Sequence, residues 1–594
     1  MRDFSQILQR AGFILVCVLT ESVCADELVG GTGEPDGSYW AHVDHTIYVD
    51  DDAPAGGAGD SWDTAYTYLQ DALMAATSLE GVVEIRIGQG RYLPDAGGGW
   101  ILGDRSATFR MTEGMVVRGG YAGRGNVDPN KRDSDRFRTA LSGDIDPDEH
   151  DVDITAIWPG YLSSLSLNHA FHVLTLGPDS NDVLLEGLWV MDGTALETTG
   201  ENGAGGGLHL DGCENVSLVD CHFLNNLACV GGAVHCSGDP VFDECTFEGN
   251  VAGEGGGGVG ILKGSPRFVN CGFMANRSIN GGAMVIFNGN PQLERCRFLD
   301  NRAGAINTAD AGFGGAVWVG YRYRRSELLI LDCSFIGNLA ASGGAVNSDH
   351  GEILFIRCAF YNNLAGSGGA VSGIAGNLTF EHSILCGNEA LRGIGGAIVI
   401  RYRTIRRNYV YVPGTLELLN CTLVGNRAPR GAHVSARAPV NLTITNSILR
   451  DGGIDLGESS NGPSSIHLAY TNLSGLMAFQ SHPSAIDLGP GNMDYDPGFL
   501  DPGYWDIGAT VNDPADDIFV VGDYHLKSEA GHWDSTSESW IRDDITSPGI
   551  NAGDPIIPIG EEPEPHGGRI NMGAYGGTAE ASLSIDLDSN SILP

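Results

Sequence analysis

One short pattern, Cys-x-Phe-x-x-Asn, recurs through the middle of this 594-residue chain and constrains the fold more than any other feature. Its eight copies start 24, 26, 25, 37, 25, 25 and 38 residues apart, and the last two copies vary the pattern. A period of this length indicates one structural unit that repeats along a solenoid. The copies are Cys221/Phe223/Asn226, Cys245/Phe247/Asn250, Cys271/Phe273/Asn276, Cys296/Phe298/Asn301, Cys333/Phe335/Asn338, Cys358/Phe360/Asn363, Ser383/Leu385/Asn388 and Cys421/Leu423/Asn426.

A second signal, Gly-Gly-Ala followed by an apolar residue, lies between the copies in the same phase, as at Gly231–Val234 and Gly343–Val346. Runs such as residues 241–250 (VFDECTFEGN) carry a small or apolar residue at every second position, which is typical of strands. Gly-Gly-Ala has a low helix propensity, which argues against a leucine-rich repeat, where a helix commonly connects successive strands. We therefore predict an all-β fold, a right-handed parallel β-helix of coils with about 25 residues, each with three short strands and three turns.

The repeated residues have distinct expected roles inside such coils. Phe at one position per coil is expected to build an internal aromatic stack. Asn at each bend is expected to tolerate left-handed backbone and to join an amide ladder between coils. The Gly-Gly pair lets the backbone turn sharply.

Most of the 13 Cys residues are predicted to be small buried hydrophobic side chains. Side chains at one inward position of successive strands run parallel and lie farther apart than a disulfide prefers, and no metal-binding Cys spacing is present. The seven Cys of this column are Cys221, Cys245, Cys271, Cys296, Cys333, Cys358 and Cys421. A disulfide remains open for the four that lie outside it, Cys213, Cys229, Cys236 and Cys386.

The two ends of the chain differ from the repeats. Residues 1–25 read as a signal peptide, because an apolar run at 11–20 precedes small residues at Val23 and Ala25. Residues 45–165 are predicted to form an N-terminal cap and the first coils. In this cap we expect a strand at 47–50, a helix at 66–77 and a strand at 82–87.

Ser61 or Asp63 is expected to cap the helix, and Leu69, Leu73 and Met74 are expected to lie against the end of the stack. Residues 166–450 form the repeats, and residues 451–594 are predicted to hold late irregular coils, a C-terminal cap and a tail.

The formal net charge of −41 excludes some partners. A field of that sign repels nucleic acid and anionic lipid, so we expect neither as a partner. No transmembrane segment is expected in the mature chain, because no later stretch approaches 18 apolar residues. We predict no metal site and no cofactor, although the many acidic residues are compatible with Ca²⁺ binding.

These residues resemble a known class of proteins. Gly-Gly-Ala-[Ile/Val] paired with Phe-x-x-Asn is similar to the repeat of the chlamydial polymorphic outer-membrane proteins and of exported bacterial right-handed β-helix, pectin-lyase-like proteins. The opening at residues 47–50 and 69–73 and the closing at 547–554 and 571–576 resemble the same class. The resemblance implies an extracellular, cell-surface or outer-membrane location.

No catalytic residue is assigned from the sequence. The motifs that glycoside hydrolases of this fold share are missing, apart from Asp-Asp pairs outside the repeats, and Lys263 is the only Lys among the repeats. We therefore expect a non-catalytic protein that acts in adhesion, glycan binding or envelope structure, with a polysaccharide or cell-surface ligand. The alternative is a polysaccharide lyase or glycoside hydrolase that acts on an acidic polysaccharide.

The two longest units carry insertions rich in Arg and Tyr, and equal phase places both insertions on one side of the rod. We hypothesise that they form a site for an anionic glycan or carboxylate, with Arg for bidentate contacts and Tyr for stacking. The alternative is that the Arg neutralise nearby carboxylates and the Tyr cover a sheet edge. The candidate residues are Tyr321, Arg322, Tyr323, Arg324, Arg325, Arg401, Tyr402, Arg403, Arg406, Arg407 and Tyr409.

Overall fold

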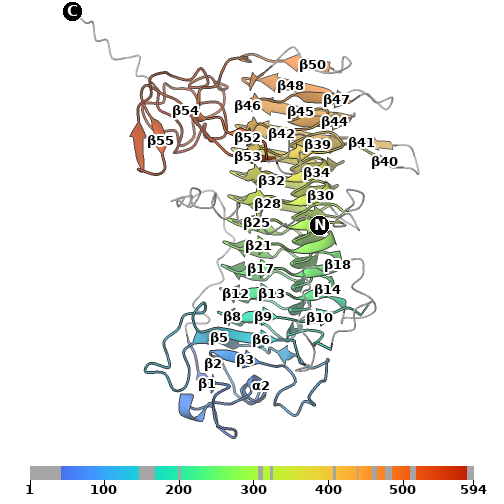
Figure 1. Ribbon diagram of the computed structural model, residues 1–594, viewed down its shortest axis with the longest axis vertical. Helices are drawn as coiled ribbons and strands as arrows, with labels where there is room; N and C mark the ends of the chain where they lie inside the picture. The colour runs from blue at the N-terminus through green and yellow to red at the C-terminus, as the bar shows by residue number, and fades with distance from the viewer. Residues whose placement is uncertain are drawn as a thin grey trace, which may run out of the picture.

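The computed structural model is an elongated rod made of stacked coils, with a smaller lobe at the side of its last coils (Figure 1). The rod consists almost entirely of parallel strands, and one α-helix lies at its N-terminal end. The structure describes residues 42–145, 168–197, 203–304, 312–320, 325–405, 410–437, 439–457, 464–474, 485–508 and 517–584.

Four parallel sheets form the walls of the rod, named here sheets A to D. Sheet A has 15 strands from β1 (His45–Val49) to β50 (Ala485–Leu488), and sheet B has 13 strands from β3 (Gly90–Tyr92) to β49 (Asn472–Leu473). Sheet C has 12 strands from β4 (Phe109–Arg110) to β47 (Ile454–Gly457). Sheet D has eight strands from β10 (Thr194–Ala195) to β38 (Glu389–Ala390).

One coil contains four strands where sheet D is present, whereas the sequence predicted three. A representative coil runs through β16 (Val241–Asp243), β17 (Thr246–Glu248), β18 (Val251–Gly255) and β19 (Val259–Lys263). The glycine that follows β18, Gly256, has a φ of 67° and separates β18 from β19. Left-handed backbone of this kind is readily adopted by glycine, so the Gly-Gly signal marks a corner between sheets D and C.

Aromatic rings form the centre of the core. The rings of one column on sheet B stack with centroid separations of 4.6 to 5.1 Å and interplanar angles of 3 to 5°. The members of this column, all fully buried, are Phe223, Phe247, Phe273, Phe298, Phe335 and Phe360. These separations match the spacing of paired strands, roughly 4.8 Å, so each coil adds one ring to the stack. Shorter stacks on sheet A, such as Phe242 on Phe268 at 4.7 Å, meet this column edge to face.

The Asn column forms a continuous amide ladder between sheets B and D. Asn250 Nδ2 donates to Asn276 Oδ1 at 3.0 Å and to the carbonyl of Phe223 at 2.9 Å. The same arrangement repeats along the whole ladder. Its members, all buried, are Asn226, Asn250, Asn276, Asn301, Asn338, Asn363, Asn388 and Asn426.

The backbone of this ladder differs from the sequence prediction. The left-handed residue is the one before each ladder Asn, as at Gly337 with a φ of 65°, Asn362 with 54° and Gly387 with 64°. The expectation that the ladder residues themselves adopt this backbone is therefore wrong, for Asn338, Asn363 and Asn388 as for the rest of the ladder. The left-handed residue makes the bend, and the Asn after it directs its side chain inward to the neighbouring coils.

The described cysteines are all free thiols, including Cys213, Cys229, Cys236 and Cys386. In the buried column each Sγ donates to backbone carbonyls at 3.2 to 3.5 Å. The column consists of Cys221, Cys245, Cys271, Cys296, Cys333, Cys358 and Cys421. Burial raises the pKa of Cys358 to about 12, so this thiol stays neutral and unreactive.

The N-terminal end is closed by α2 (Leu69–Ala76), which packs on β1 and β2 (Val83–Gly88). Leu69 and Leu73 are buried in the core, but Met74 is 59 % exposed, which corrects its expected position. The residue before the helix is Tyr68, and no side chain caps it, because residues 62–64 form a separate 3₁₀ turn after Ser61. The expected signal peptide lies outside the described residues. The described residues contain no helix with the length and apolar character needed to cross a membrane.

The C-terminal region is irregular and packs against the outer face of sheet B (Figure 1). Its short strands pair antiparallel, as β51 (Phe499–Asp501) with β54 (Asp523–Leu526) and β52 (Tyr504–Asp506) with β53 (Ile518–Val520). Asn362, directly after β33 (Ala359–Tyr361) of sheet B, exchanges two hydrogen bonds of 3.1 Å with the backbone of Phe519. Arg427 stacks on the ring of Trp505 at 3.7 Å and pairs with Asp517 at 2.7 Å.

Candidate functional site

The Arg- and Tyr-rich insertions both connect sheet C to sheet A. Arg325 precedes β28 (Glu327–Leu331), while Arg401 ends β39 (Ile398–Arg401) and Arg403 starts β40 (Arg403–Ile405). β40 pairs antiparallel with β41 (Val410–Val412) in a hairpin that projects from the rod (Figure 1). The other candidates, Tyr321, Arg322, Tyr323, Arg324, Arg406, Arg407 and Tyr409, lie outside the described residues.

Arg325 and Arg403 contact the same turn, which joins β31 (Val346–Asp349) to β32 (Glu352–Ile356). Arg325 Nη1 lies 3.0 Å from Glu352 Oε1. Arg403 Nη1 lies 3.3 Å from Asp349 Oδ1 and 3.1 Å from Nδ1 of His350. Both arginines thus bind acidic or polar side chains of this protein and tie the two insertions to one turn.

Arg401 is placed differently. Its side chain is half-buried at the end of sheet C, next to Arg437 on the following coil. Burial and the charge of Arg437 lower the pKa of Arg401. It therefore lies apart from the turn that Arg325 and Arg403 share.

A groove of about 650 Å³ lies directly beside this turn, on the outer face of sheet A. It crosses β24 (Gln292–Glu294), β28, β32 and β36 (Asn377–Glu381), which follow one another along the axis of the rod. The residues that line it are Asn290, Pro291, Gln292, Glu327, Leu328, Leu329, Glu352, Ile353, Leu354, Asn377, Thr379 and Glu381.

The register of sheet A arranges these side chains in rows. Gln292, Leu329, Leu354 and Thr379 are aligned on successive strands, so two half-buried leucines lie side by side between two hydrogen-bonding residues. Strand residues alternate between the two faces of a sheet, which places Ile330 and Phe355 in the core while their neighbours face the groove.

A second row along the groove is polar. Glu327, Glu352 and Asn377 are aligned on β28, β32 and β36. At the other end of β36, burial and the nearby charge of Glu417 raise the pKa of Glu381. The groove therefore combines an apolar floor with carboxylate and amide edges.

Sequence reasoning missed this groove. Its only signal is the alternation in residues 327–331, 352–356 and 377–381, and an outward polar position in these runs resembles any solvated sheet face.

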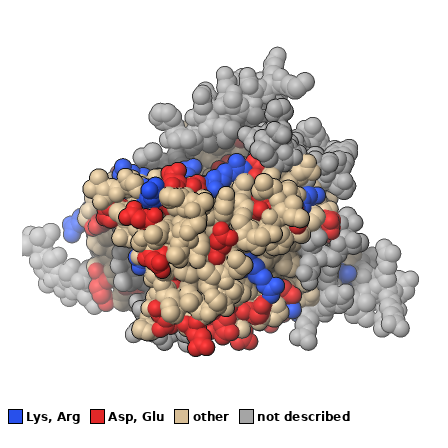
Figure 2. All heavy atoms as spheres, turned by 90° about the horizontal axis from the view of Figure 1, so that it is seen from below, with Lys and Arg blue, Asp and Glu red and all other residues tan. Residues whose placement is uncertain are grey.

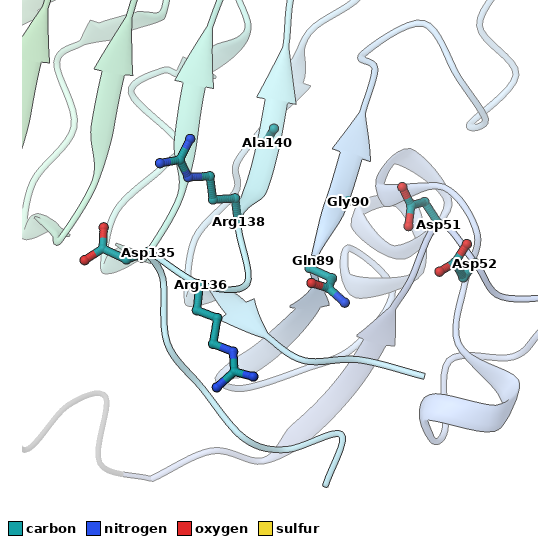
Figure 3. Close-up of a pocket in the computed structure, with 8 residues that line it drawn as sticks. All are labelled: Asp51, Asp52, Gln89, Gly90, Asp135, Arg136, Arg138 and Ala140. Carbon is teal, nitrogen blue, oxygen red and sulfur yellow. The ribbon is translucent and has the colours of Figure 1, made fainter. Parts of the chain in front are cut away.

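A second recess, of about 570 Å³, lies near the N-terminal end (Figure 3). Asp51 and Asp52 lie on one side of it and Arg136 and Arg138 on the other, with Gln89 between them. Arg138 stacks on the ring of Trp189 at 4.1 Å, away from the acidic side. The two charged sides are thus not directed at a shared centre.

The columns predicted from the repeat face the core and line neither of these two recesses. Phe247 and Phe335 are fully buried among neighbouring rings of their stack. Asn338, Asn363 and Asn388 direct their amides to one another and to backbone carbonyls of the adjacent coils. These residues therefore hold the strands that carry the groove, and they offer no group to a ligand bound in it.

Asp50, Asp51 and Asp52 are the residues in the described ranges whose metal-ligand atoms would all lie within 4.8 Å of one another. Asp50 is buried, and its two oxygens accept backbone N–H groups of Asp52 at 3.0 Å and Arg124 at 2.6 Å. The cluster is therefore explained by its hydrogen bonds, which hold this turn in place.

Seen from the N-terminal end, acidic side chains spread over the face of the rod and gather along one edge (Figure 2).

Histidines stack along the outer face of sheet C. His209 and His235 are paired in register, and their rings are 5.0 Å apart at 16°. His172 extends the stack at 5.1 Å. Burial and the neighbouring His209 lower the pKa of His235 to about 4, so His235 packs as a neutral ring.

Comparison with known proteins identifies the architecture. A family model described as "Right handed beta helix region" matches residues 206–385. A search of curated proteins found no match. The crystal structure of pectate lyase Pel9A is similar to this chain with a TM-score of 0.34 and 11 % identity, over 90 % of this chain and 96 % of that chain. The likeness to the chlamydial repeat stays a prediction. With the sheets described above, the family match identifies the rod as a right-handed parallel β-helix.

Proposed function

We propose that this chain is an exported or cell-surface protein that binds a polysaccharide in the sheet A groove without cleaving it. The observation that carries this proposal is the composition of the groove. Leu329 and Leu354 offer an apolar floor for the faces of sugar rings, and Gln292 and Thr379 flank them with groups that bond to hydroxyls. An apolar surface with a few placed polar groups is the usual make-up of a binding site.

The succession of strands that line the groove also suits a chain-like ligand. Four neighbouring coils contribute to it, and each coil advances by roughly 4.8 Å along the rod. That step is close to the length of one pyranose unit in an extended polysaccharide, so successive sugars would meet equivalent positions on successive strands.

The described arginines of the insertions act as supports in this proposal. Arg325 and Arg403 hold the turn from Asp349 to Glu352, which forms one rim of the groove. The remaining Arg and Tyr of the insertions stay candidate ligand residues. Export is proposed from the apolar run at residues 11–20, which has the character of a signal peptide.

A glycoside hydrolase is the second candidate, and one observation favours it. Burial and the nearby charge of Glu417 raise the pKa of Glu381, and a carboxyl group with a raised pKa beside a second carboxyl group is what a general acid and its partner require. No corresponding arrangement of a basic residue beside acidic Ca²⁺ ligands is assigned for a lyase.

The test uses the mature chain, residues 26–594, against a panel of neutral, acidic and amino polysaccharides, with and without Ca²⁺. Binding and release of reducing ends or unsaturated products are measured together. We expect binding without product, and weaker binding for the double variant Leu329→Asn/Leu354→Asn.

The matched control is Val241→Asn, because Val241 occupies the same outward row of sheet A three strands before Leu329. Loss of binding in this control as well, or undiminished binding in the double variant, would place the ligand elsewhere. Product release would favour the hydrolase.

A further inference from the structure

Four outward carboxylates of sheet A occupy one register column but have different surroundings. The column contains Glu186 on β8 (Val183–Glu186), Asp243 on β16, Glu294 on β24 and Glu381 on β36. These residues share a sheet face and a row, so the partners of their side chains can be compared directly.

Outside the groove, the two glutamates of this column are neutralised by arginine, while Asp243 accepts a hydrogen bond from Asn270 Nδ2 at 3.2 Å. Glu186 accepts from Arg118 Nε at 2.8 Å and also pairs with Arg132. Burial acts to raise the pKa of Glu186, but the hydrogen bonds from these two arginines outweigh burial and lower it. Arg267 and Arg295 do the same for Glu294, with Arg267 Nη2 at 2.8 Å.

Along the groove this pairing stops. Within the part of the chain that the structure describes, Glu327, Glu381 and Glu417 have no cationic partner. Glu327 is directly opposite Glu352 on the next strand, and only Glu352 is compensated, by Arg325. Like charges opposite one another destabilise a sheet. At Glu381, burial and then the nearby charge of Glu417 raise the pKa of the carboxyl group.

We propose that the groove is built for a glycan that carries free amino groups, with Glu327 and Glu381 as the residues that bind its ammonium groups. The inference rests on the proposed function and names the chemical class of its ligand. A cationic sugar would supply the positive charge that Arg supplies to Glu186 and Glu294 on the same sheet face.

The rest of the groove explains why the cation belongs to a sugar. Leu329 and Leu354 lie between the two carboxylates and provide apolar contact for ring faces, which a metal ion or a small amine cannot use. A chain with a charge on each sugar also gains from the net charge of −41, which attracts cations before contact. Polyanionic glycans are repelled by the same net negative charge.

The experiment compares glucosamine oligomers that have free amines with the same oligomers after full N-acetylation. Binding to the mature chain is measured by calorimetry at about pH 6, where the amines of the oligomer are protonated and exposed carboxylates are ionised. Homogalacturonan is the anionic probe. The variants are Glu327→Gln and Glu381→Gln, alone and together, and Glu248→Gln is the control, because Glu248 is exposed on sheet B and its replacement changes the net charge equally.

We expect the free-amine oligomer to bind about tenfold or more tightly than its acetylated form, because a partly buried charge pair changes the binding affinity by a factor of this size. Glu327→Gln/Glu381→Gln should remove this preference, added salt should weaken it, and Glu248→Gln should retain it. Equal binding of the acetylated oligomer, or a preference for homogalacturonan, would overturn the charge inference and leave the glycan-binding proposal standing. Failure of every glycan in the panel to bind would overturn both.

Discussion

Replacing one rung of the amide ladder should destabilise the rod strongly at a single coil. Asn301 is fully buried, and its Oδ1 accepts from the backbone N and from Nδ2 of Asn276, both at 3.0 Å. Its Nδ2 donates to the carbonyl of Phe273 at 2.9 Å. Nδ2 of Asn301 also donates to Asn338 Oδ1 at 3.0 Å, but this oxygen keeps the backbone N–H of residue 301 as a donor in the variant. Asn301→Ala therefore leaves three other buried polar groups without these partners.

The expected cost follows from those three groups. Each buried polar group that loses its partner costs about 1–3 kcal/mol, and the losses are not fully additive, so we expect about 3–6 kcal/mol. Because the contacts of a solenoid are made with neighbouring coils, the loss should appear as local opening between residues 271 and 338.

Hydrogen exchange measures this loss at individual amides. The amide of Asn276 should exchange about a hundredfold faster or more in Asn301→Ala. Asn441→Ala is the control, because Asn441 is exposed and its side chain accepts a hydrogen bond from Ser465 Oγ, and surface changes of this kind stay within about 0.5 kcal/mol. A change below about 1 kcal/mol at Asn276 would refute the role of the ladder in holding coils together.

Three further predictions concern packing and the C-terminal region. Phe298→Ala should cost about 3–5 kcal/mol by opening a cavity in the aromatic stack, as measured by denaturant unfolding of the repeats. Gly387→Ala should detach the C-terminal region, because a Cβ there would lie 2.3 Å from Cβ of Phe519, and limited proteolysis should show faster cleavage in residues 517–584. Burial acts to lower the pKa of His525, but its contacts with Asp523 at 2.6 Å and Glu580 at 3.5 Å raise it. The stabilisation is therefore complete below the ordinary His pKa of about 6.5 and is lost as pH rises through the raised value. The protection of amides in β54, relative to their intrinsic exchange rate at each pH, should therefore fall over that range in wild type but not in His525→Gln.

The fold could be predicted from the sequence because the same physical constraints recur in every coil. Phe, Asn and Gly-Gly each have one role that repeats at a fixed interval, so period and alternation together indicated parallel coils. The fourth strand was missed because the sequence does not show whether Gly256 bends a strand or ends it. The left-handed position was assigned one residue too late, because Asn tolerates that backbone and the preceding position varies from Gly337 to Asn362.

The position of the C-terminal region depends on contacts that have no period. Asn362 binds Phe519 across 157 residues, and no local pattern in either segment indicates that pairing. Met74 was expected to be buried because it is apolar, but the helix is short and only its Leu69 and Leu73 face contacts the core.

The groove was missed for a related reason. Glu327 and Glu381 occupy ordinary outward positions of short strands, and only the absence of arginine partners among the described residues distinguishes them from Glu294. Pairing of this kind depends on which side chains meet across coils, which the repeat alone does not determine.

Carboxyl footprinting in the presence of a bound glycan tests the central claim most directly. The accessible carboxylates of the mature chain are esterified with a diazo reagent, which does not couple them to the amines of the ligand, with and without the glucosamine oligomer. We predict that bound glycan protects Glu327 and Glu381, while Glu248 on sheet B labels equally in both samples. Protection confined to carboxylates outside the groove, or unchanged labelling of Glu327 and Glu381 at saturating ligand, would contradict the assignment of the groove as the binding site.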